Sequence, residues 1–159
     1  MRDFFKRYIP EFVYGAVDGT VTTFAVVAAS AGAGISSSVI LILGIANLIA
    51  DGFSMGSSAY LAASAEHEES VRDSQKRSSP KIIGAVTFLA FVVVGSVPVL
   101  PYLIDVIANL KAPNAVLFYI SSALTAATFL AIGFIKGKVS KQSPWQSAGI
   151  TLLLGAIAA

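Results

Sequence analysis

Long apolar stretches separated by short polar segments run along the whole chain and predict an all-α membrane protein. A helix rises about 1.5 Å per residue and the hydrocarbon of a bilayer is about 30 Å thick, so roughly twenty apolar residues cross it. Five stretches fit such helices, and they cover residues 12–33, 37–69, 82–104, 115–135 and 145–159. The pattern therefore predicts a single domain of five transmembrane helices.

Two of the predicted helices have unusual lengths. The second, over 37–69, contains neither a proline nor two adjacent glycines that would end it. At about 50 Å it is longer than the bilayer is thick, and we expect its acidic end to project into water. The fifth, over 145–159, would measure only about 22 Å, which is short for a span. We expect the natural chain to continue beyond it.

The composition agrees with a membrane protein. Hydrophobic residues make up 55% of the chain and charged residues 13%, with a mean hydropathy of +0.77, whereas soluble domains are about 45–50% apolar. Because the chain has no cysteine, it can form neither disulfides nor thiolate metal sites. It also lacks a phosphate-binding loop, a Ser/His/Asp arrangement and an HExxH motif, so we expect neither an enzyme nor an ATP-driven pump.

The basic residues are distributed unevenly and predict the orientation in the membrane. All Lys and Arg except Lys111 lie before the first helix, between the second and third, or between the fourth and fifth. Short segments rich in Lys and Arg stay in the cytosol, so we expect a cytosolic N-terminus. The net charge of +2 does not indicate nucleic-acid binding, because the charges lie between apolar runs. A cleaved signal peptide is also disfavoured, since Asp18 interrupts the first apolar stretch.

Two carboxylates are expected deep in the membrane. Asp18 follows Arg7 by eleven residues, which places it about 16 Å into the bilayer, and Asp51 lies at a similar depth on the second helix. A carboxylate at this depth is costly unless it is paired, hydrated or protonated, and by default it marks an ion or proton path. The alternative is a structural acid that is hydrogen-bonded to Asn47 or to a threonine of the first helix.

A column of possible metal ligands runs along the second predicted helix. Asn47, Asp51 and Met55 are spaced four residues apart and therefore share one face, and the column continues to Glu66 and Glu69 at the cytosolic entrance. Oxygen donors combined with a thioether suit first-row transition metals better than Mg²⁺ or Ca²⁺. Met55 as a packing residue and the two glutamates as a solvated helix end are the alternatives.

Glycine pairs accompany both acids. Gly15 and Gly19 flank Asp18, and Gly52 and Gly56 follow Asp51. Glycines four residues apart allow helix backbones to approach closely, so we expect the first and second helices to pair through them. An odd number of spans cannot form an inverted repeat within one chain, so a two-fold path would need two copies.

These motifs resemble those of the vacuolar iron transporters, which comprise the iron and manganese importers of plant and yeast vacuoles and their prokaryotic relatives. The similarity rests on Tyr14-Gly-Ala-Val-Asp18-Gly19 and on Asn47-Leu-Ile-Ala-Asp51-Gly-x-Ser-Met55-Gly56. The resemblance implies a five-helix homodimer that moves Fe²⁺ and Mn²⁺ out of the cytosol in exchange for H⁺. It also implies that Asp18 and Met55 are intramembrane metal ligands, with Asp18 of both protomers beside a central path.

The chain departs from this family in one segment. Eukaryotic members carry a long metal-binding domain rich in Glu and Met between the second and third helices, whereas only the polar loop 66–81 is present here. We therefore expect weaker capture of cytosolic metal, and a location in a prokaryotic cytoplasmic membrane rather than a vacuolar one. Two other functions stay open, a non-transporting scaffold for an iron-storage partner and a passive cation channel.

Overall fold

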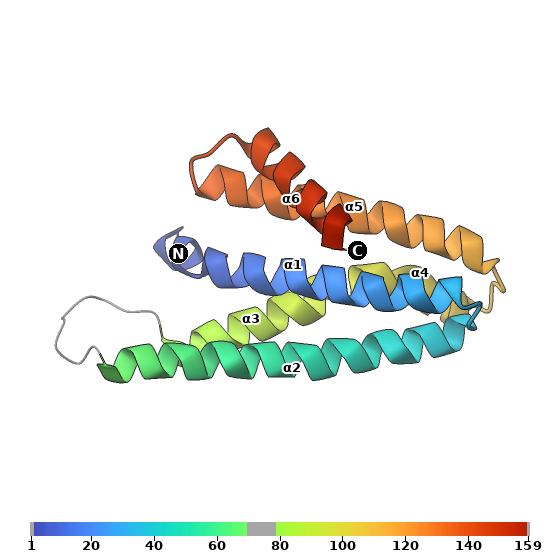
Figure 1. Ribbon diagram of the computed structural model, residues 1–159, viewed down its shortest axis with the longest axis horizontal. Coiled ribbons are helices and arrows are strands. Elements are labelled where there is room, and N and C mark those ends of the chain that lie inside the picture. The colour runs from blue at the N-terminus through green and yellow to red at the C-terminus, as the bar shows by residue number, and fades with distance from the viewer. Residues whose placement is uncertain (1, 70–78, 159) are drawn as a thin grey trace.

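The computed structural model describes residues 2–69 and 79–158, with side chains for residues 7–66 and 79–158. In this part of the chain the secondary structure is entirely helical, which confirms the expected all-α class. The elements are α1 (Arg2–Gly32), α2 (Ser37–Glu69), α3 (Pro80–Gly95), the 3-10 segment η1 (Val97–Val99), α4 (Leu100–Ala108), α5 (Asn114–Val139) and α6 (Pro144–Ala158). They form one elongated bundle (Figure 1).

Four helical stretches of the described residues are long and apolar enough to cross a membrane: Arg7–Gly32, Ser37–Glu66, Pro80–Ala108 and Asn114–Val139. The third of them combines α3, η1 and α4. The last helix, α6, has 15 residues and is not one of these four. It ends near the middle of the bundle's length (Figure 1). Four of the five expected spans are therefore supported, and a crossing by α6 stays a prediction.

The first helix is longer than the pattern predicts, because α1 begins at Arg2 rather than near residue 12. The charged residues before position 12 interrupt the apolar pattern but do not prevent helix formation. An α-helix satisfies its backbone hydrogen bonds internally in water and in lipid alike. The apolar pattern therefore indicates where a span begins and not where the helix begins.

The third predicted helix, over 82–104, is broken in the structure. It ends at Gly95, passes through η1 and resumes as α4. The cause is Pro98 together with Pro101, because a proline lacks the N–H that an α-helix needs and clashes with the preceding turn. The hydroxyl of Ser121 on α5 donates to the Pro98 carbonyl at 2.6 Å, which holds the break against α5.

The glycine pairs pack against α3, and not against each other. All four of these glycines, Gly15, Gly19, Gly52 and Gly56, face α3 residues. A Cβ added at Gly19 would lie 2.5 Å from the Phe91 carbonyl oxygen. The expected direct pairing of α1 and α2 through glycines is thus wrong. Helix α3 is uncharged along its apolar length and contains small residues. Helices α1 and α2 therefore both pack their glycine-containing faces against it.

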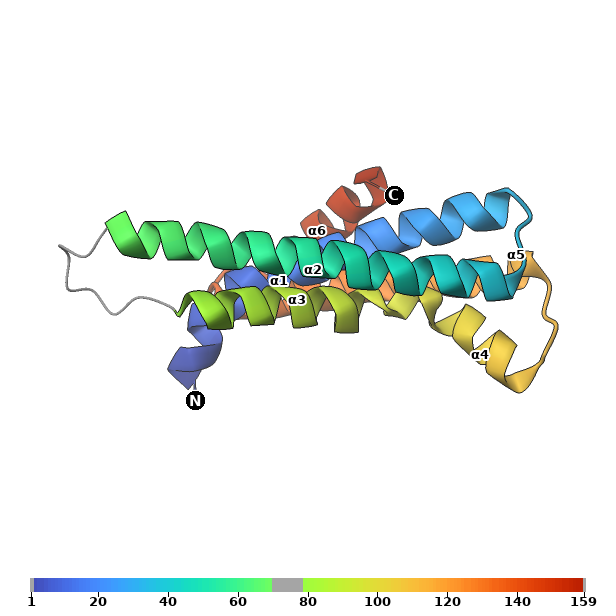
Figure 2. The same ribbon diagram turned by 90° about the horizontal axis from the view of Figure 1, so that it is seen from below.

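The bundle has two distinct ends. The start of α1, the start of α3 and the turn between α5 and α6 lie at one end, and the α1–α2 turn and the α4–α5 connection lie at the other (Figures 1 and 2). Lys81, Lys136, Lys138 and Lys141 belong to segments at the first end. We call it the basic end.

We expect Gly19→Ala to lower the free energy of unfolding by about 1–3 kcal/mol, because the Phe91 backbone must move to admit the new methyl group. Thermal unfolding in detergent measures the effect. Gly149→Ala is the matched control, since a Cβ at Gly149 meets no atom within 4 Å and alanine favours helix. Equal losses in the two variants would contradict the close contact of α1 with α3.

Candidate metal-transit site

A groove of ≈ 490 Å³ between α1 and α2 collects polar side chains of both helices. We call it the acidic groove. Three of the four predicted metal ligands, Asp18, Asp51 and Met55, line it, together with Tyr14, Ser54, Ser58, Ala59 and Ala62. The structure thus brings together carboxylates and a thioether from two helices.

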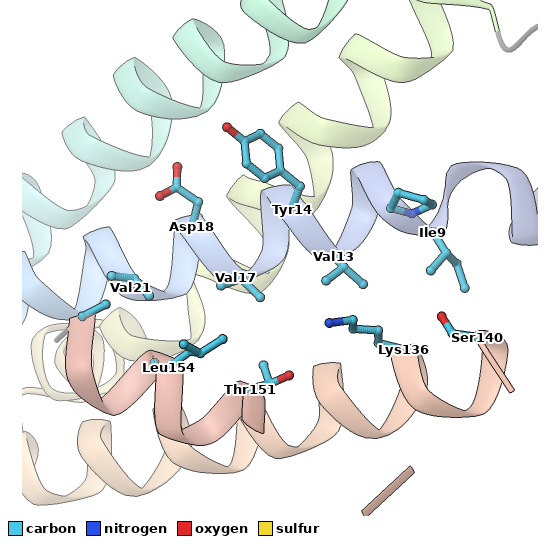
Figure 3. Close-up of a pocket in the computed structure, with 13 residues that line it drawn as sticks. Ile9, Val13, Tyr14, Val17, Asp18, Val21, Lys136, Ser140, Thr151 and Leu154 are labelled. Atoms are coloured by element: carbon cyan, nitrogen blue, oxygen red, sulfur yellow. The ribbon is translucent and has the colours of Figure 1, made fainter. Parts of the chain in front are cut away.

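The packing of α1 determines the direction of Asp18. With Gly15 and Gly19 held against α3, the neighbouring positions Tyr14 and Asp18 turn to another side of the helix. Figure 3 shows both polar ends pointing from α1 to the side on which α2 runs. Asp51 and Met55 meet them there because they are one turn apart on α2.

Both carboxylates lack a protein partner within the part of the chain that the structure describes. The nearby threonines are used elsewhere: Thr20 donates to the Ala16 carbonyl at 2.7 Å, and Thr22 donates to the backbone carbonyl of Asp18 at 2.9 Å. Hydrogen bonds to these residues do not stabilise the Asp18 carboxylate. The structural alternative for the two acids therefore finds no support.

Asn47 lies one turn from Asp51 but is not part of the groove lining. Its amide nitrogen donates to the hydroxyls of Thr22 and Thr23, at 3.4 and 3.3 Å. Asn47 therefore links α2 to α1 beside the acidic groove. A direct role for Asn47 as a metal ligand stays a prediction.

The predicted site residues do not include Glu11, which lies two turns before Asp18 on α1. Its Oε2 atom is buried and has no hydrogen-bond partner among the described residues. Glu11, Tyr14 and Asp18 have the i, i+3, i+7 spacing of one helix face, and this signal could have found it. It escapes notice because Glu11 directly precedes the apolar stretch that begins at residue 12.

Of the two acids predicted for the cytosolic entrance, the structure describes the side chain of Glu66 but not that of Glu69. Glu66 is exposed and lies one turn beyond Ala62, which lines the acidic groove. The side chain of Glu69 lies outside the described residues, as does the central part, 70–78, of the predicted loop 66–81. An entrance role for both acids stays a prediction.

The acidic groove contains few strong metal ligands. Among the described residues, no three His, Cys, Asp or Glu side chains come together. The acidic groove offers two carboxylates and one thioether, and the hydroxyls of Tyr14, Ser54 and Ser58 are weaker oxygen donors in the same lining. Asp51 is exposed at the surface of the protomer, while Asp18 and Met55 are half-buried.

Comparison with known proteins identifies the family. The sequence model described as VIT family matches residues 9–81 and 67–159. The chain belongs to the VIT family. This assignment confirms the resemblance found in the motifs, and with the four apolar spans it makes the chain a multi-pass membrane protein. It also agrees with the expectation that the chain is not an enzyme.

Individual relatives match this VIT-family chain over different lengths. It is 46% identical to a vacuolar iron transporter of Toxoplasma gondii (strain ATCC 50861 / VEG) over 61 residues, which are 38% of this chain and 20% of that protein. It is 32% identical to a vacuolar iron transporter of Plasmodium berghei (strain Anka) over 71 residues, which are 45% of this chain and 26% of that protein. These two matches therefore span about a quarter or less of the relatives' length.

A plant relative matches nearly the whole chain. Vacuolar iron transporter 1 of Eucalyptus grandis is 28% identical over 210 aligned positions, which cover 94% of this chain and 82% of that protein. The alignment is longer than the 159 residues of this chain, so the plant protein carries additional residues within it. The two segments of the family match overlap at 67–81, within the predicted loop.

We expect Ser54→Cys in the acidic groove to react readily with a charged, water-soluble thiol reagent in reconstituted protein, because the polar lining retains water. The natural chain has no cysteine, so the introduced thiol is the only target. Ile49→Cys is the control, since Ile49 is 60% exposed on the same helix outside the groove, where we expect it to face lipid. Labelling rates measured by mass spectrometry should differ severalfold, and equal rates would contradict a hydrated groove.

Proposed function

We propose that the chain is a proton-coupled transporter that moves divalent transition metal, Fe²⁺ and Mn²⁺, out of the cytosol. The observation that carries the proposal is the acidic groove, in which Asp18, Asp51 and Met55 meet within the spans, while neither carboxylate has a protein partner among the described residues. The names of the plant and parasite relatives, vacuolar iron transporters, support iron as the cargo.

The donor chemistry of the groove favours first-row transition metals. Carboxylate oxygens are hard ligands that also bind Mg²⁺ and Ca²⁺, whereas the Met55 thioether is a soft ligand that these two ions do not seek. Fe²⁺ and Mn²⁺ accept the oxygen donors and tolerate the sulfur. Asp18 and Asp51 therefore provide affinity for divalent cations, and Met55 adds a preference for Fe²⁺ and Mn²⁺ over Mg²⁺ and Ca²⁺.

A homodimer explains why Asp51 lies at the surface of one protomer. A charged side chain that faces lipid at the bilayer centre costs about 2.5–3.5 kcal/mol. If two protomers meet across a two-fold axis with their acidic grooves facing, the carboxylates are covered and the donor set doubles to four carboxylates and two thioethers. In this proposal each protomer crosses a prokaryotic cytoplasmic membrane five times, with its N-terminus in the cytosol.

Proton coupling follows from competition for the same carboxylates. A metal ion needs the ionised form, so binding releases protons, and protonation from the far side weakens the site and releases the metal. On the cytosolic side, Glu11 lies two turns before Asp18, and Tyr14 lies between them. Metal from the cytosol would pass Tyr14 to reach Asp18, because both residues line the acidic groove, whereas Glu11 does not.

We expect purified protein in liposomes to move Fe²⁺ or Mn²⁺ with proton flux in the opposite direction, and Asp18→Asn to abolish both fluxes. A metal-sensitive dye and a pH-sensitive dye inside the liposomes record them. Asp105→Asn is the matched control. Asp105 is a buried acid of α4 whose Oδ1 accepts from the Ala112 N–H at 2.9 Å, away from the groove, and an asparagine oxygen preserves that bond.

The same measurement separates the other functions. A passive cation channel predicts metal flux that does not respond to a pH gradient, and a scaffold for an iron-storage partner predicts no flux at all. Undiminished transport in Asp18→Asn would exclude the acidic groove as the transit site.

We expect isothermal titration calorimetry with Mn²⁺ to give one ion per two chains, because the two acidic grooves combine into one site. Asp18→Asn and Asp51→Asn should each weaken binding, since each removes two carboxylates from the combined site. Asp105→Asn should leave both affinity and stoichiometry unchanged. A stoichiometry of one ion per chain would contradict the shared site.

A further inference from the structure

A second and larger groove, of ≈ 730 Å³, lies between α1 and the α5–α6 hairpin. We call it the basic groove. Its walls are apolar and include Val13 and Val17 of α1 and Leu154 of α6, while Lys136 and Ser140 of the α5 end line it near the basic end of the bundle. Figure 3 shows Lys136 beside the α1 face that carries Val13 and Val17.

This groove differs from the acidic groove in its mostly apolar lining and in its one basic residue, Lys136. Tyr14 and Asp18 border both grooves, but their polar ends point from α1 to the side of α2, away from Lys136 (Figure 3). In the described part of the chain, the Lys136 ammonium has no ion pair or hydrogen bond. It is therefore an exposed cation at one end of a long apolar groove.

We propose that the basic groove binds an anionic phospholipid of the cytosolic leaflet. The lipid phosphate contacts Lys136 and the Ser140 hydroxyl, and an acyl chain lies along Val13, Val17 and Leu154. Charge complementarity selects this occupant, because a basic pocket between membrane helices on the cytosolic side is suited to an anionic headgroup. A metal ion is repelled by Lys136, and water alone does not satisfy apolar walls of this length.

A second copy of the chain is a poorer occupant for the basic groove. The surface that most needs a second copy is the acidic groove, where Asp51 is exposed. Among the described residues that line the basic groove, Asp18 is the one acid, and its carboxylate points away from Lys136 (Figure 3). The apolar walls of the groove are compatible with lipid chains. The two grooves on either side of α1 therefore serve different partners.

The headgroup contact is tested by native mass spectrometry of the purified protein, titrated with phosphatidylglycerol or with phosphatidylcholine of the same acyl chains. We expect phosphatidylglycerol to bind more tightly, and Lys136→Gln to weaken its binding about fivefold. Lys138→Gln is the matched control, since Lys138 is exposed on the same last turn of α5 but does not line the groove.

The acyl contact is tested with a second matched pair of variants. Leu153 and Leu154 are both 60% exposed on α6, and only Leu154 lines the groove. We expect Leu154→Trp to fill the groove and reduce the amount of retained phosphatidylglycerol, and Leu153→Trp to leave it unchanged. Asp51 lines the acidic groove and not the basic groove. Binding by Asp51→Asn should equal that of the natural chain, so a failure of the lipid site is distinguishable from a failure of the transport proposal.

Several results would overturn the lipid site. Equal affinity for the two phospholipids, or equal effects of Lys136→Gln and Lys138→Gln, would remove the headgroup contact. Displacement of phosphatidylglycerol by millimolar inorganic phosphate would indicate a site for free phosphate. A change of oligomeric state in Leu154→Trp, with lipid binding unchanged, would assign the groove to a second copy of the chain.

Discussion

The close packing of α1 and α2 on α3 is the contact on which the rest of the molecule depends. Gly19 approaches the Phe91 backbone so closely that an added Cβ would lie 2.5 Å from its carbonyl oxygen, and Gly56 lies comparably near Gly84. Such contacts determine the rotation of each helix about its own axis. Once the glycine faces are buried, Asp18 and Asp51 have to turn toward the remaining open side, where α1 and α2 border the same groove.

A membrane makes this arrangement significant, because lipid cannot hydrate a carboxylate. In water, an exposed Asp51 would need no explanation. Within a span it is costly, and the cost is removed only by water, a bound cation or another protein surface. The threonines near Asp18 do not remove it, since they donate to backbone carbonyls. A bound cation is one of these ways of removing the cost, and cation binding in the acidic groove agrees with membership of the VIT family.

Helix α1 separates two grooves of opposite character. One side presents Asp18 to α2, and the other presents Val13 and Val17 to a groove that contains Lys136. Because Lys136 lies on the far side of α1, it does not form a salt bridge with Asp18. A lysine beside Asp18 would compete with a metal ion for the same carboxylate. The separation of the two charges is thus compatible with metal binding in one groove and an anionic ligand in the other.

Much of this structure follows from the sequence alone. Apolar stretches of span length determine the all-α class and four of the spans, because a bilayer requires about twenty apolar residues for each crossing. The four-residue spacing of Asp51 and Met55 determines that they share a face of α2, because helical geometry is local. Family membership is also contained in the motifs around Asp18 and Asp51.

Only the tertiary structure decided which faces meet. Glycine spacing shows that a helix can be approached closely but does not identify the partner helix. The sequence therefore could not predict that the glycines of α1 and α2 pack against α3 and not against each other. The burial of the Glu11 Oε2 atom, the link from Asn47 to the α1 threonines and the separation of Lys136 from Asp18 have the same origin. Each depends on how helices distant in sequence rotate and pack, and local periodicity carries no information about that.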